Sequence, residues 1–568
     1  MTRDYNKQFT IDDLREDKVF CTKAWAAISV SPSGSVFPCC LFEKPIEDEN
    51  SRPYRIWETD VEEIYNSEFM QDIRRKMLCG ESIEACRQCY QSETYGGDSL
   101  RITSNHEQYE IIPEYNLTDK LLPISIDLKL NNKCNLKCRM CQPRDSSLIQ
   151  NEFQKVIEKD NSFENFSNAD LIDPDLKIPL SEIPSWEQSE VFLNSFNSLL
   201  GGLRKISMVG GEPLIMNQFY QILDKCIDSD NAKNIYVAVT TNLMYAPKEK
   251  LDIYMESFHS FLFNISLDAV GEELNYIRYP ATIEKIEKNF KKIYREDPNG
   301  LIQFQFTPTV QVYNALYIHE VYQFVERLIE EGYKFAPRAV HLTYLNFPMH
   351  LNIRILPERI RKLSIKKLKT FLLFSKHLVN NSFVVKNYIQ LIKLLSNDYH
   401  DDRDRYLAEF LYYTKVLDEE RNQKMKDFLP NLYNELIELK IEPKKPAPSY
   451  YKLRDRGWKH ARANEFLEAI TCFETSVKYS DDPFIDYREI SWMKLDLQDF
   501  EGAMKSYELA YGLKEDDEDV IRGLAAVYRC LGKYNLSDKL LNSGLKIFGE
   551  KSAFVTHYNE NIRRKENT

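Results

Sequence analysis

The sequence predicts an α/β protein built on a parallel sheet that helices cover, with a small cysteine-rich domain before it and an all-α domain after it. Three observations support this prediction. Short apolar runs alternate with helical patterns between residues 123 and 345. Six of the 12 cysteines precede residue 90. One arrangement of small and aromatic residues recurs after residue 449 at an interval of 34 residues.

The central domain, residues 116–356, is expected to form a partial (β/α)6 barrel. Its strands are near-continuous apolar runs, which are typical of parallel sheets covered on both faces. The polar residues 159–190 interrupt the first crossover and predict an exposed insertion. The six expected strands are PISIDLKL (123–130), KISMVG (205–210), IYVAVTTN (235–242), FLFNISLD (261–268), LIQFQFTPTV (301–310) and VHLTYL (340–345).

Composition narrows the class of protein. At 568 residues the chain exceeds the size of one domain, and its net charge of −12 argues against general nucleic-acid binding, which needs a basic surface. No apolar run approaches the length of a membrane span, and the first residues have no signal-peptide character. We therefore expect a cytoplasmic protein without a membrane or nucleic-acid partner, in which cysteine clusters indicate metal or redox chemistry.

The C-terminal part is expected to be helical throughout. Residues 357–441 predict a helical segment, and EPKKPAP at 442–448 predicts a linker. The recurrence in residues 449–560 resembles the tetratricopeptide repeat; the alternative is an ordinary helical bundle. The resemblance implies three repeats that bind an extended peptide or a protein on a concave face. The repeated positions are Gly457, Ala469, Phe473 and Ser476, then Ser491, Ala503, Tyr507 and Ala510, then Ala525, Ser537, Leu541 and Gly544.

Three cysteines directly after the first expected strand define the central site. Cys134, Cys138 and Cys141 lie within the nine residues KCNLKCRMC. Three thiolates leave a tetrahedral structural zinc ion one ligand short, whereas a four-iron cluster bound by three thiolates keeps one iron open. An open iron can bind a substrate or a cosubstrate.

The spacing Cys-x3-Cys-x2-Cys after a first strand resembles the signature of radical S-adenosylmethionine (radical SAM) enzymes, whose fold is a partial six-unit barrel. The resemblance extends through residues 123–345. It implies a [4Fe-4S] cluster whose open iron binds S-adenosylmethionine, and reductive cleavage of that cosubstrate to methionine and a 5′-deoxyadenosyl radical. It also implies an electron donor such as flavodoxin or ferredoxin, and it places Met140 near the adenine.

The ends of the expected strands carry the residues that this resemblance assigns to S-adenosylmethionine, because barrel sites lie at the carboxyl ends of strands. In GGEP, Gly210 and Gly211 would let backbone approach the cosubstrate, and Glu212 would bind its ammonium group. For each polar residue the alternative is a helix cap or a turn hydrogen bond. The other assigned residues are Asn242, Ser266 and Asp268 for the ribose and carboxylate, and Arg278 for the methionine carboxylate.

Four N-terminal cysteines predict a second metal site within residues 1–115. Cys21 and Cys39 flank the expected β-hairpin AAISVSPSGSVFP (26–38), and Cys86 and Cys89 form a C-x2-C pair. A hairpin that brings two thiolates to a C-x2-C pair makes a four-thiolate site. This spacing fits a zinc ribbon as well as an iron–sulfur cluster, so it leaves the metal open.

The segments GSVFPCC and CRQCY resemble the twitch and SPASM domains of radical SAM enzymes. That resemblance implies a second, auxiliary [4Fe-4S] cluster in the twitch form, held by Cys21, Cys39, Cys86 and Cys89. Cys40 and Cys79 are then surplus, and either Cys39 or Cys40 supplies the second ligand. Such modules usually follow the barrel, whereas this one precedes it, so the part of the barrel that it faces stays open.

A cluster with four protein thiolates has no open iron, so its expected use is electron transfer during an oxidation. Together with the repeats, this predicts a radical SAM enzyme that oxidatively modifies a peptide or protein substrate. One alternative is a small-molecule dehydrogenase whose repeats bind a partner protein. The other is a non-enzymatic iron–sulfur scaffold. No residue is predicted as a catalytic acid, base or radical relay.

Overall fold

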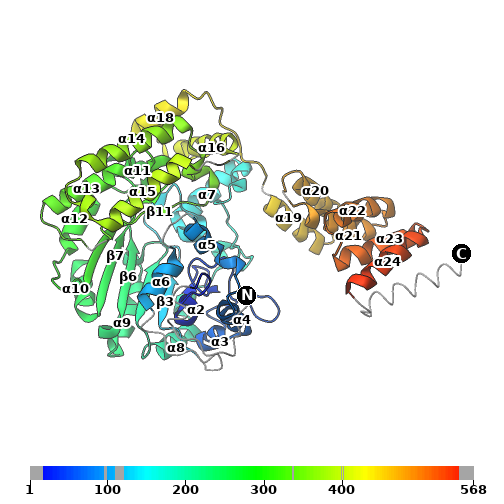
Figure 1. Ribbon diagram of the computed structural model, residues 1–568, viewed down its shortest axis with the longest axis horizontal. Coiled ribbons are helices and arrows are strands. Elements are labelled where there is room, and N and C mark those ends of the chain that lie inside the picture. Colours follow the sequence, from blue (N-terminus) through cyan, green and yellow to red (C-terminus); the bar gives the residue numbers. More distant parts are fainter. Residues whose placement is uncertain are drawn as a thin grey trace. The chain divides into compact units, whose positions relative to one another are not determined.

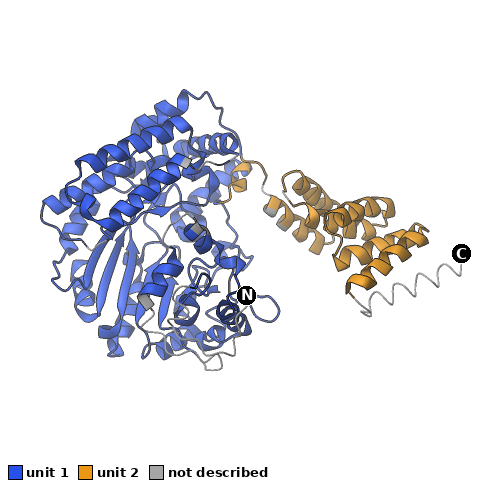
Figure 2. Ribbon diagram, in the orientation of Figure 1, with its two compact units in different colours: residues 1–161, 168–445 blue, residues 162–167, 446–568 orange. Residues whose placement is uncertain are grey.

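The computed structural model describes residues 17–94, 99–108, 121–335, 338–397, 400, 402–448, 450–480 and 482–548. It divides into two compact units (Figure 2). Unit 1 comprises residues 1–161 and 168–445, and unit 2 comprises residues 162–167 and 446–568. The expected boundary near residue 115 lies outside the described residues.

A parallel sheet forms the centre of unit 1 (Figure 1). Five of the six expected strands lie in it in chain order, each parallel to its neighbour. The α/β class predicted from the alternating apolar runs is therefore confirmed. These strands are β3 (Ser125–Lys129), β5 (Lys205–Val209), β6 (Tyr236–Thr241), β7 (Ser260–Ile265) and β9 (Ile302–Phe306).

The sixth expected strand lies beside the sheet rather than within it. β11 (Thr343–Tyr344) pairs in parallel with β10 (Thr309–Val310), and a single bridge joins Val340 to Phe306 at the end of β9. Pro308 separates β9 from β10, and a proline has no N–H to donate to a continuous ladder. The strand order is therefore as expected, but the ladder is interrupted before its last member.

The two faces of the sheet differ in polarity. In β3, Ile126 and Leu128 are fully buried, whereas Asp127 and Lys129 are half-buried. Because side chains alternate between the faces of a strand, one face is apolar and the other is polar. The register of the strands places further half-buried polar side chains on the same face as Asp127: Lys205, Ser207, Thr240 and Asn264.

The N-terminal hairpin extends this sheet. β1 (Ala27–Val30) and β2 (Val36–Phe37) pair antiparallel, as predicted, and β1 pairs in parallel with β3. Gly34 lies in the turn with φ of +74°, and a Cβ atom there would lie 2.3 Å from the ring of Trp57, so only glycine fits. The cysteine-rich module thus continues the sheet at the edge of the first barrel strand.

The insertion is partly buried, which corrects the expectation of an exposed segment at 159–190. The indole of Trp186 is 1% exposed, and its Nε1–H donates to the carbonyl oxygen of Pro32 in the hairpin turn at 3.0 Å. Leu180 is also buried. These apolar side chains lie within a mostly polar stretch, and burying them against the hairpin gives the insertion a packed position.

Helices lie alongside the sheet (Figure 1). Crossover helix α9 (Asn217–Asp228) buries Phe219, Leu223 and Cys226, so the isolated Cys226 packs as a small apolar residue. The other helices before residue 357 are α2 (Lys23–Ala26), α3 (Val61–Tyr65), α4 (Glu68–Leu78), α5 (Arg87–Thr94), α6 (Leu100–Gln108), α7 (Ser147–Lys159), α8 (Glu190–Leu199), α10 (Lys248–Ser257), α11 (Glu272–Ile277), α12 (Ile283–Ile293) and α13 (Ile318–Glu330).

After the last strand, unit 1 continues with a helical segment that returns to the barrel. Its third helix contacts the segment that follows β11 and, through side chains, the loop that follows β3. The helices are α14 (Glu358–Phe374), α15 (Ser382–Asn397), α16 (Arg403–Arg421), α17 (Met425–Phe428) and α18 (Pro430–Ile437).

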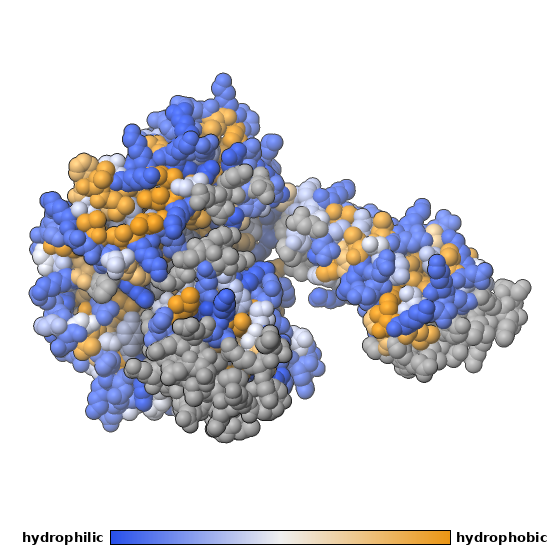
Figure 3. All heavy atoms as spheres, in the orientation of Figure 1, coloured by the Kyte–Doolittle hydropathy of each residue, from blue (hydrophilic) through white to orange (hydrophobic). Residues whose placement is uncertain are grey.

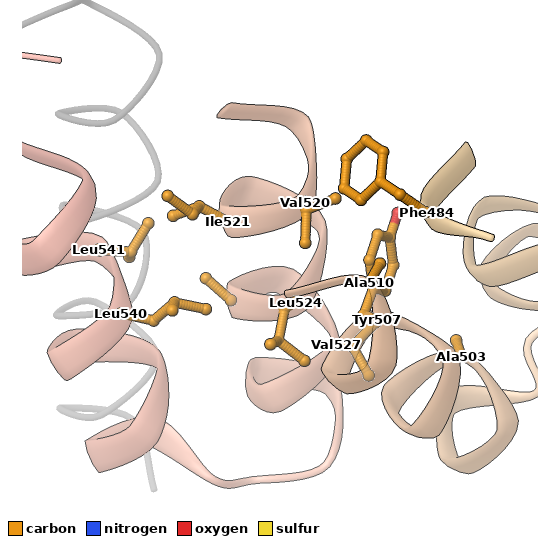
Figure 4. Close-up of a cluster of buried hydrophobic side chains, with 11 residues drawn as sticks. Phe484, Ala503, Tyr507, Ala510, Val520, Ile521, Leu524, Val527, Leu540 and Leu541 are labelled. Atoms are coloured by element: carbon orange, nitrogen blue, oxygen red, sulfur yellow. The ribbon is translucent and has the colours of Figure 1, made fainter. Parts of the chain in front are cut away.

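Unit 2 is a stack of three helical hairpins. The repeated small residues lie where helices meet, since Ala469, Ala503 and Ser537 are fully buried. Tyr507 packs in a buried cluster with Leu541 (Figure 4). The helices pair in the order α19 (Tyr450–Arg462) with α20 (Phe466–Val477), α21 (Phe484–Asp496) with α22 (Phe500–Leu513), and α23 (Glu518–Cys530) with α24 (Tyr534–Phe548). The C-terminal region is thus helical, with the pairing that the 34-residue interval predicts.

Hydrophilic side chains cover most of the face shown in Figure 3, and apolar side chains form smaller patches between them. Among the residues that the structure describes, no helix is long and apolar enough to cross a membrane.

Candidate functional site

The three central thiols lie together in the loop after β3. Cys138 belongs to β4 (Lys137–Cys138), which pairs antiparallel with β8 (Arg278–Tyr279). Burial, followed by the neighbouring Cys138, raises the pKa of Cys134 to about 12. Burial also raises the pKa of Cys141, and Asp145 and both other thiols add to this rise. Cys134, Cys138 and Cys141 are thus within electrostatic range of one another. We call residues 131–143 the three-thiol loop.

The GGE turn packs directly against the three-thiol loop. The N–H of Gly211 donates to the carbonyl oxygen of Asp145 at 3.2 Å, and the N–H of Glu212 donates to that of Lys133 at 2.9 Å. Gly211 has φ of +48°, and a Cβ atom there would lie 2.3 Å from the Lys133 oxygen. A side chain would therefore push the turn away from the loop. Contact between these glycines and the cosubstrate stays a prediction.

Glu212 joins the ends of β5 and β6. Its carboxylate accepts hydrogen bonds from Thr241 Oγ1 at 2.6 Å, from the N–H of Asn242 at 2.7 Å and from the N–H of Leu214 at 3.2 Å. Burial raises the pKa of Glu212 to about 7, against the effect of these donors. The negative charge of Glu212 also contributes to raising the pKa of Cys134. A carboxylate offers about four acceptor positions, so one remains for an ammonium group.

Glu212→Gln is expected to weaken S-adenosylmethionine binding about 10- to 100-fold while both clusters stay loaded. It removes a charged contact worth about 1.5–3 kcal/mol. Thr241→Val is the matched control, because it removes one donor to Glu212 but keeps the carboxylate charge. Calorimetric titration of the anaerobic proteins measures both affinities. Equal weakening in the two variants would show that Glu212 acts only by holding the turn.

Arg278 contacts one of the ligand thiols. Its Nη1–H lies 3.8 Å from Cys138 Sγ, and its Nε–H donates to Asp268 Oδ2 at 2.7 Å. Asp268 is fully buried and also accepts from the N–H of Thr309 at 2.7 Å. Asp268 therefore orients Arg278, whose guanidinium lies beside Cys138, a predicted cluster ligand.

The remaining predicted residues lie at the same edge of the sheet. Asn242 donates from Nδ2 to Asn135 Oδ1 at 2.8 Å, which links the end of β6 to the three-thiol loop. The N–H of Ser266 donates to the carbonyl oxygen of Thr241 at 2.8 Å, and its side chain is half-buried. Met140 is half-buried as well. Asn135 was not predicted, because an asparagine in a loop carries no local signal of this contact.

The four predicted N-terminal thiols are also within electrostatic range of one another. Burial raises the pKa of Cys21 to about 12, with smaller contributions from Cys89 and Cys86. Burial raises the pKa of Cys39 to about 12, with Cys21 as the next cause. Burial raises the pKa of Cys86 to about 12, and Cys39 and Cys89 add to this rise. Cys21 precedes α2, Cys39 follows β2, and Cys86 and Cys89 lie at the start of α5.

The Cys40 thiol is influenced mainly by a different residue, Asp127. Burial, followed by the Asp127 carboxylate on the polar face of β3, raises the pKa of the Cys40 thiol. Asp127 Oδ1 is buried without a hydrogen-bond partner. The Cys39 thiol responds to Cys21 and Cys89, whereas the Cys40 thiol responds most to Asp127, and this difference favours Cys39 as the ligand.

Both groups suit iron–sulfur clusters by their donors. Thiolates are the ligands that such clusters use, with four in a closed site and three in a site with an open iron. The Arg278 guanidinium beside Cys138 favours the thiolate form that a metal needs. Within the described part of the chain, no three Cys, His, Asp or Glu side chains lie close enough to bind a single metal ion.

Comparison with known proteins supports this description. Residues 128–303 match the model of the Radical SAM superfamily, and residues 21–90 match SPASM, an iron-sulfur cluster-binding domain. The chain thus carries a radical SAM domain, preceded by a SPASM domain that begins at Cys21. These two domains imply iron–sulfur clusters and S-adenosylmethionine as cofactors.

Individual proteins match this chain at low sequence identity and over only part of its length. GTP 3′,8-cyclase of Staphylococcus carnosus (strain TM300) is 26% identical over 160 residues, which cover 28% of this chain and 38% of that protein. GTP 3′,8-cyclase of Staphylococcus haemolyticus (strain JCSC1435) is 24% identical with the same coverage. The chain therefore spans less than two fifths of the length of these relatives.

Solved structures show partial similarity as well. Native anSMEcpe with bound AdoMet aligns at 17% identity over 43% of this chain and 59% of that chain, with a TM-score of 0.28. The first TPR of Spaghetti (RPAP3) bound to an HSP90 peptide aligns at 17% identity over 21% of this chain and 93% of that chain, with a TM-score of 0.19.

Proposed function

We propose that the protein is a radical SAM enzyme that cleaves S-adenosylmethionine at the three-thiol loop and oxidatively modifies a peptide or protein. The four-thiol module holds an auxiliary cluster that takes up the electron left on the substrate. One observation carries the proposal: β1, which lies between the ligand cysteines Cys21 and Cys39, pairs along its whole length with β3, which leads into the three-thiol loop.

This pairing fixes both thiol groups to one sheet. Asp127, Lys129 and Lys205 lie on its polar face, and Asp127 also meets Cys40 from the four-thiol module. When bound at the three-thiol loop, a [4Fe-4S] cluster with an open iron supplies the electron that cleaves S-adenosylmethionine. The chain contributes Arg278 beside one ligand and Glu212 for the ammonium group. It also supplies a polar surface between the two thiol groups on which a substrate is held.

Unit 2 supports a peptide as the substrate. A cavity of about 450 Å3 is lined by residues of α21, α22 and α23. Trp492 is 43% exposed there, and Arg488, Arg522 and Asp519 supply charges of both signs. An exposed indole with charged neighbours suits an extended peptide, and stacked helical hairpins present such surfaces.

A small-molecule substrate is the second candidate. The 26% identity to a GTP 3′,8-cyclase favours it, as does the charged polar face of the sheet. In that case unit 2 binds a partner protein and not the substrate.

The test uses the full-length protein, reconstituted anaerobically and reduced with dithionite. It is incubated with S-adenosylmethionine and either a random peptide library or GTP. The expected result is 5′-deoxyadenosine release together with a mass change in a subset of peptides. Cys86→Ala/Cys89→Ala should still cleave S-adenosylmethionine but give no oxidised peptide. Consumption of GTP with unchanged peptides would favour the small-molecule reaction, and no cleavage under any reductant would favour a non-enzymatic scaffold.

A further inference from the structure

A buried arginine lies inside the three-thiol loop. Arg139 sits between Cys138 and Cys141 in the sequence, and its side chain is 0% exposed. A guanidinium in such a position is costly unless charges and hydrogen bonds compensate it. Two of its partners come from the helical segment that follows the barrel: Nη2 donates to Asp418 Oδ1 at 2.6 Å and to Gln423 Oε1 at 3.0 Å.

Tyr276 completes the surroundings of this guanidinium. Arg139 Nε–H donates to the Tyr276 carbonyl oxygen at 2.9 Å, and the guanidinium carbon lies 3.6 Å from the centre of the Tyr276 ring. The Tyr276 hydroxyl donates in turn to Asp418 Oδ1 at 2.8 Å. Asp418 also accepts from the N–H of Met425 at 2.8 Å, so its carboxylate is fixed from several sides.

Two further contacts tie α16 to the same loop. The hydroxyl of Tyr413 donates to the carbonyl oxygen of Arg139 at 2.6 Å. Arg421, at the end of α16, pairs with Glu152 of α7 at 2.6 Å, and both side chains are 1% exposed. Glu152 also pairs with Lys137 of the loop at 3.2 Å. The loop is therefore held by α16 through its backbone and through two buried ion-pair groups.

We propose that α16 is a clamp that holds the three-thiol loop in its cluster-binding conformation, with Arg139 and Asp418 as positioning residues. Helix α16 lies more than 100 residues beyond the end of the radical SAM match at residue 303, which ends before β10. The helical segment after the barrel is thus part of the cluster site. The proposal rests on the three-thiol loop as the cluster site, and it does not depend on the substrate.

The test separates positioning from general stability by removing both charges at once. Asp418→Leu alone leaves the buried Arg139 without its charge partner and is expected to destabilise the fold. Arg139→Met/Asp418→Leu removes the pair and fills its volume with apolar atoms, so the melting temperature should return toward that of the wild type. Arg454→Met is the control, because it breaks an equally buried ion pair, Arg454–Asp486 at 2.7 Å, in unit 2.

The full-length proteins are loaded anaerobically, and release of iron to a chelator is followed. In the double variant, the half of the iron held by the three-thiol loop should be released at least 10-fold faster. The electron paramagnetic resonance signal that responds to S-adenosylmethionine should shrink in parallel. Arg454→Met should match the wild type in both measurements.

Wild-type iron release and signal in a folded double variant would overturn the clamp. The same conclusion follows if the double variant and Arg454→Met lose iron equally fast. If the wild type itself shows no signal that responds to S-adenosylmethionine, the proposed function fails instead. The two failures are therefore distinguishable.

Discussion

Replacing Cys134, Cys138 and Cys141 together by alanine is expected to remove about half of the bound iron and to abolish S-adenosylmethionine cleavage. The three thiols form one group in the loop after β3, whereas the other four lie in the module attached through β1. Loss of one group leaves the other intact, because each supplies its own ligands. Iron and sulfide analysis after anaerobic reconstitution, with chromatography of 5′-deoxyadenosine, measures both effects.

Single-cysteine controls make this result specific. Cys226→Ala changes a thiol that is buried in α9 and contacts neither group, so it should leave the iron content unchanged. Cys40→Ala should also keep both clusters, whereas Cys39→Ala should lose the auxiliary one, because the Cys39 thiol responds to Cys21 and Cys89 and the Cys40 thiol responds most to Asp127. A wild-type protein that carries one four-iron cluster and one zinc ion would contradict the auxiliary cluster.

Much of the barrel could be predicted, because its signals are local. The run IYVAVTTN became β6, and the polar residues at its carboxyl end, Thr241 and Asn242, lie at the candidate site. The interruption at Pro308 could be read from the sequence but not its consequence for β11. Attachment of the hairpin to β3 could not be predicted, since β1 and β3 lie about 100 residues apart and strand pairing at that separation leaves no local pattern.

The candidate site could likewise be predicted only in part from the sequence. The cysteines and the GGE turn were predicted because their spacing is distinctive. The GGE turn packs against the three-thiol loop, and the roles of these residues as ligands stay predictions. The role of Asp268 toward Arg278 needed the structure, because a carboxylate at a strand end is compatible with several partners. Nothing in the sequence around Arg139 indicated its role. Its meaning depends on Asp418, which lies 279 residues away, and an arginine between cysteines equally suits an exposed position.

Removing unit 2 is expected to spare S-adenosylmethionine cleavage but to raise the KM for a full-length peptide substrate about 100-fold or more. Cutting after Lys445 follows the boundary between the units and keeps the contacts that hold the end of unit 1, including the ion pair between Lys445 and Asp160 at 3.0 Å. Tethered sites gain effective concentration, commonly by factors of about 100 to 10,000, and this gain is lost on truncation.

A full-length variant controls for packing that the truncation itself removes. Residues 162–167 belong to unit 2, where Lys452 donates to the carbonyl oxygen of Glu164, so truncation also removes packing from Phe163 and Phe166. Trp492→Ala leaves that packing in place; it removes an indole that is 43% exposed in the cavity of unit 2 and whose ring contacts Phe466. It should raise the KM in the same direction, by about 10-fold, if the indole anchors the peptide.

The shape of the kinetic change distinguishes recruitment from catalysis. A short fragment that contains only the modified residues cannot reach both units, so at high concentration the truncated and full-length enzymes should modify it equally well. For the full-length peptide, kcat should stay within about twofold while KM rises, because weaker ground-state binding leaves the chemical step unchanged. An unchanged KM in the truncated enzyme would show that unit 2 serves another partner, and the small-molecule reaction would then be favoured.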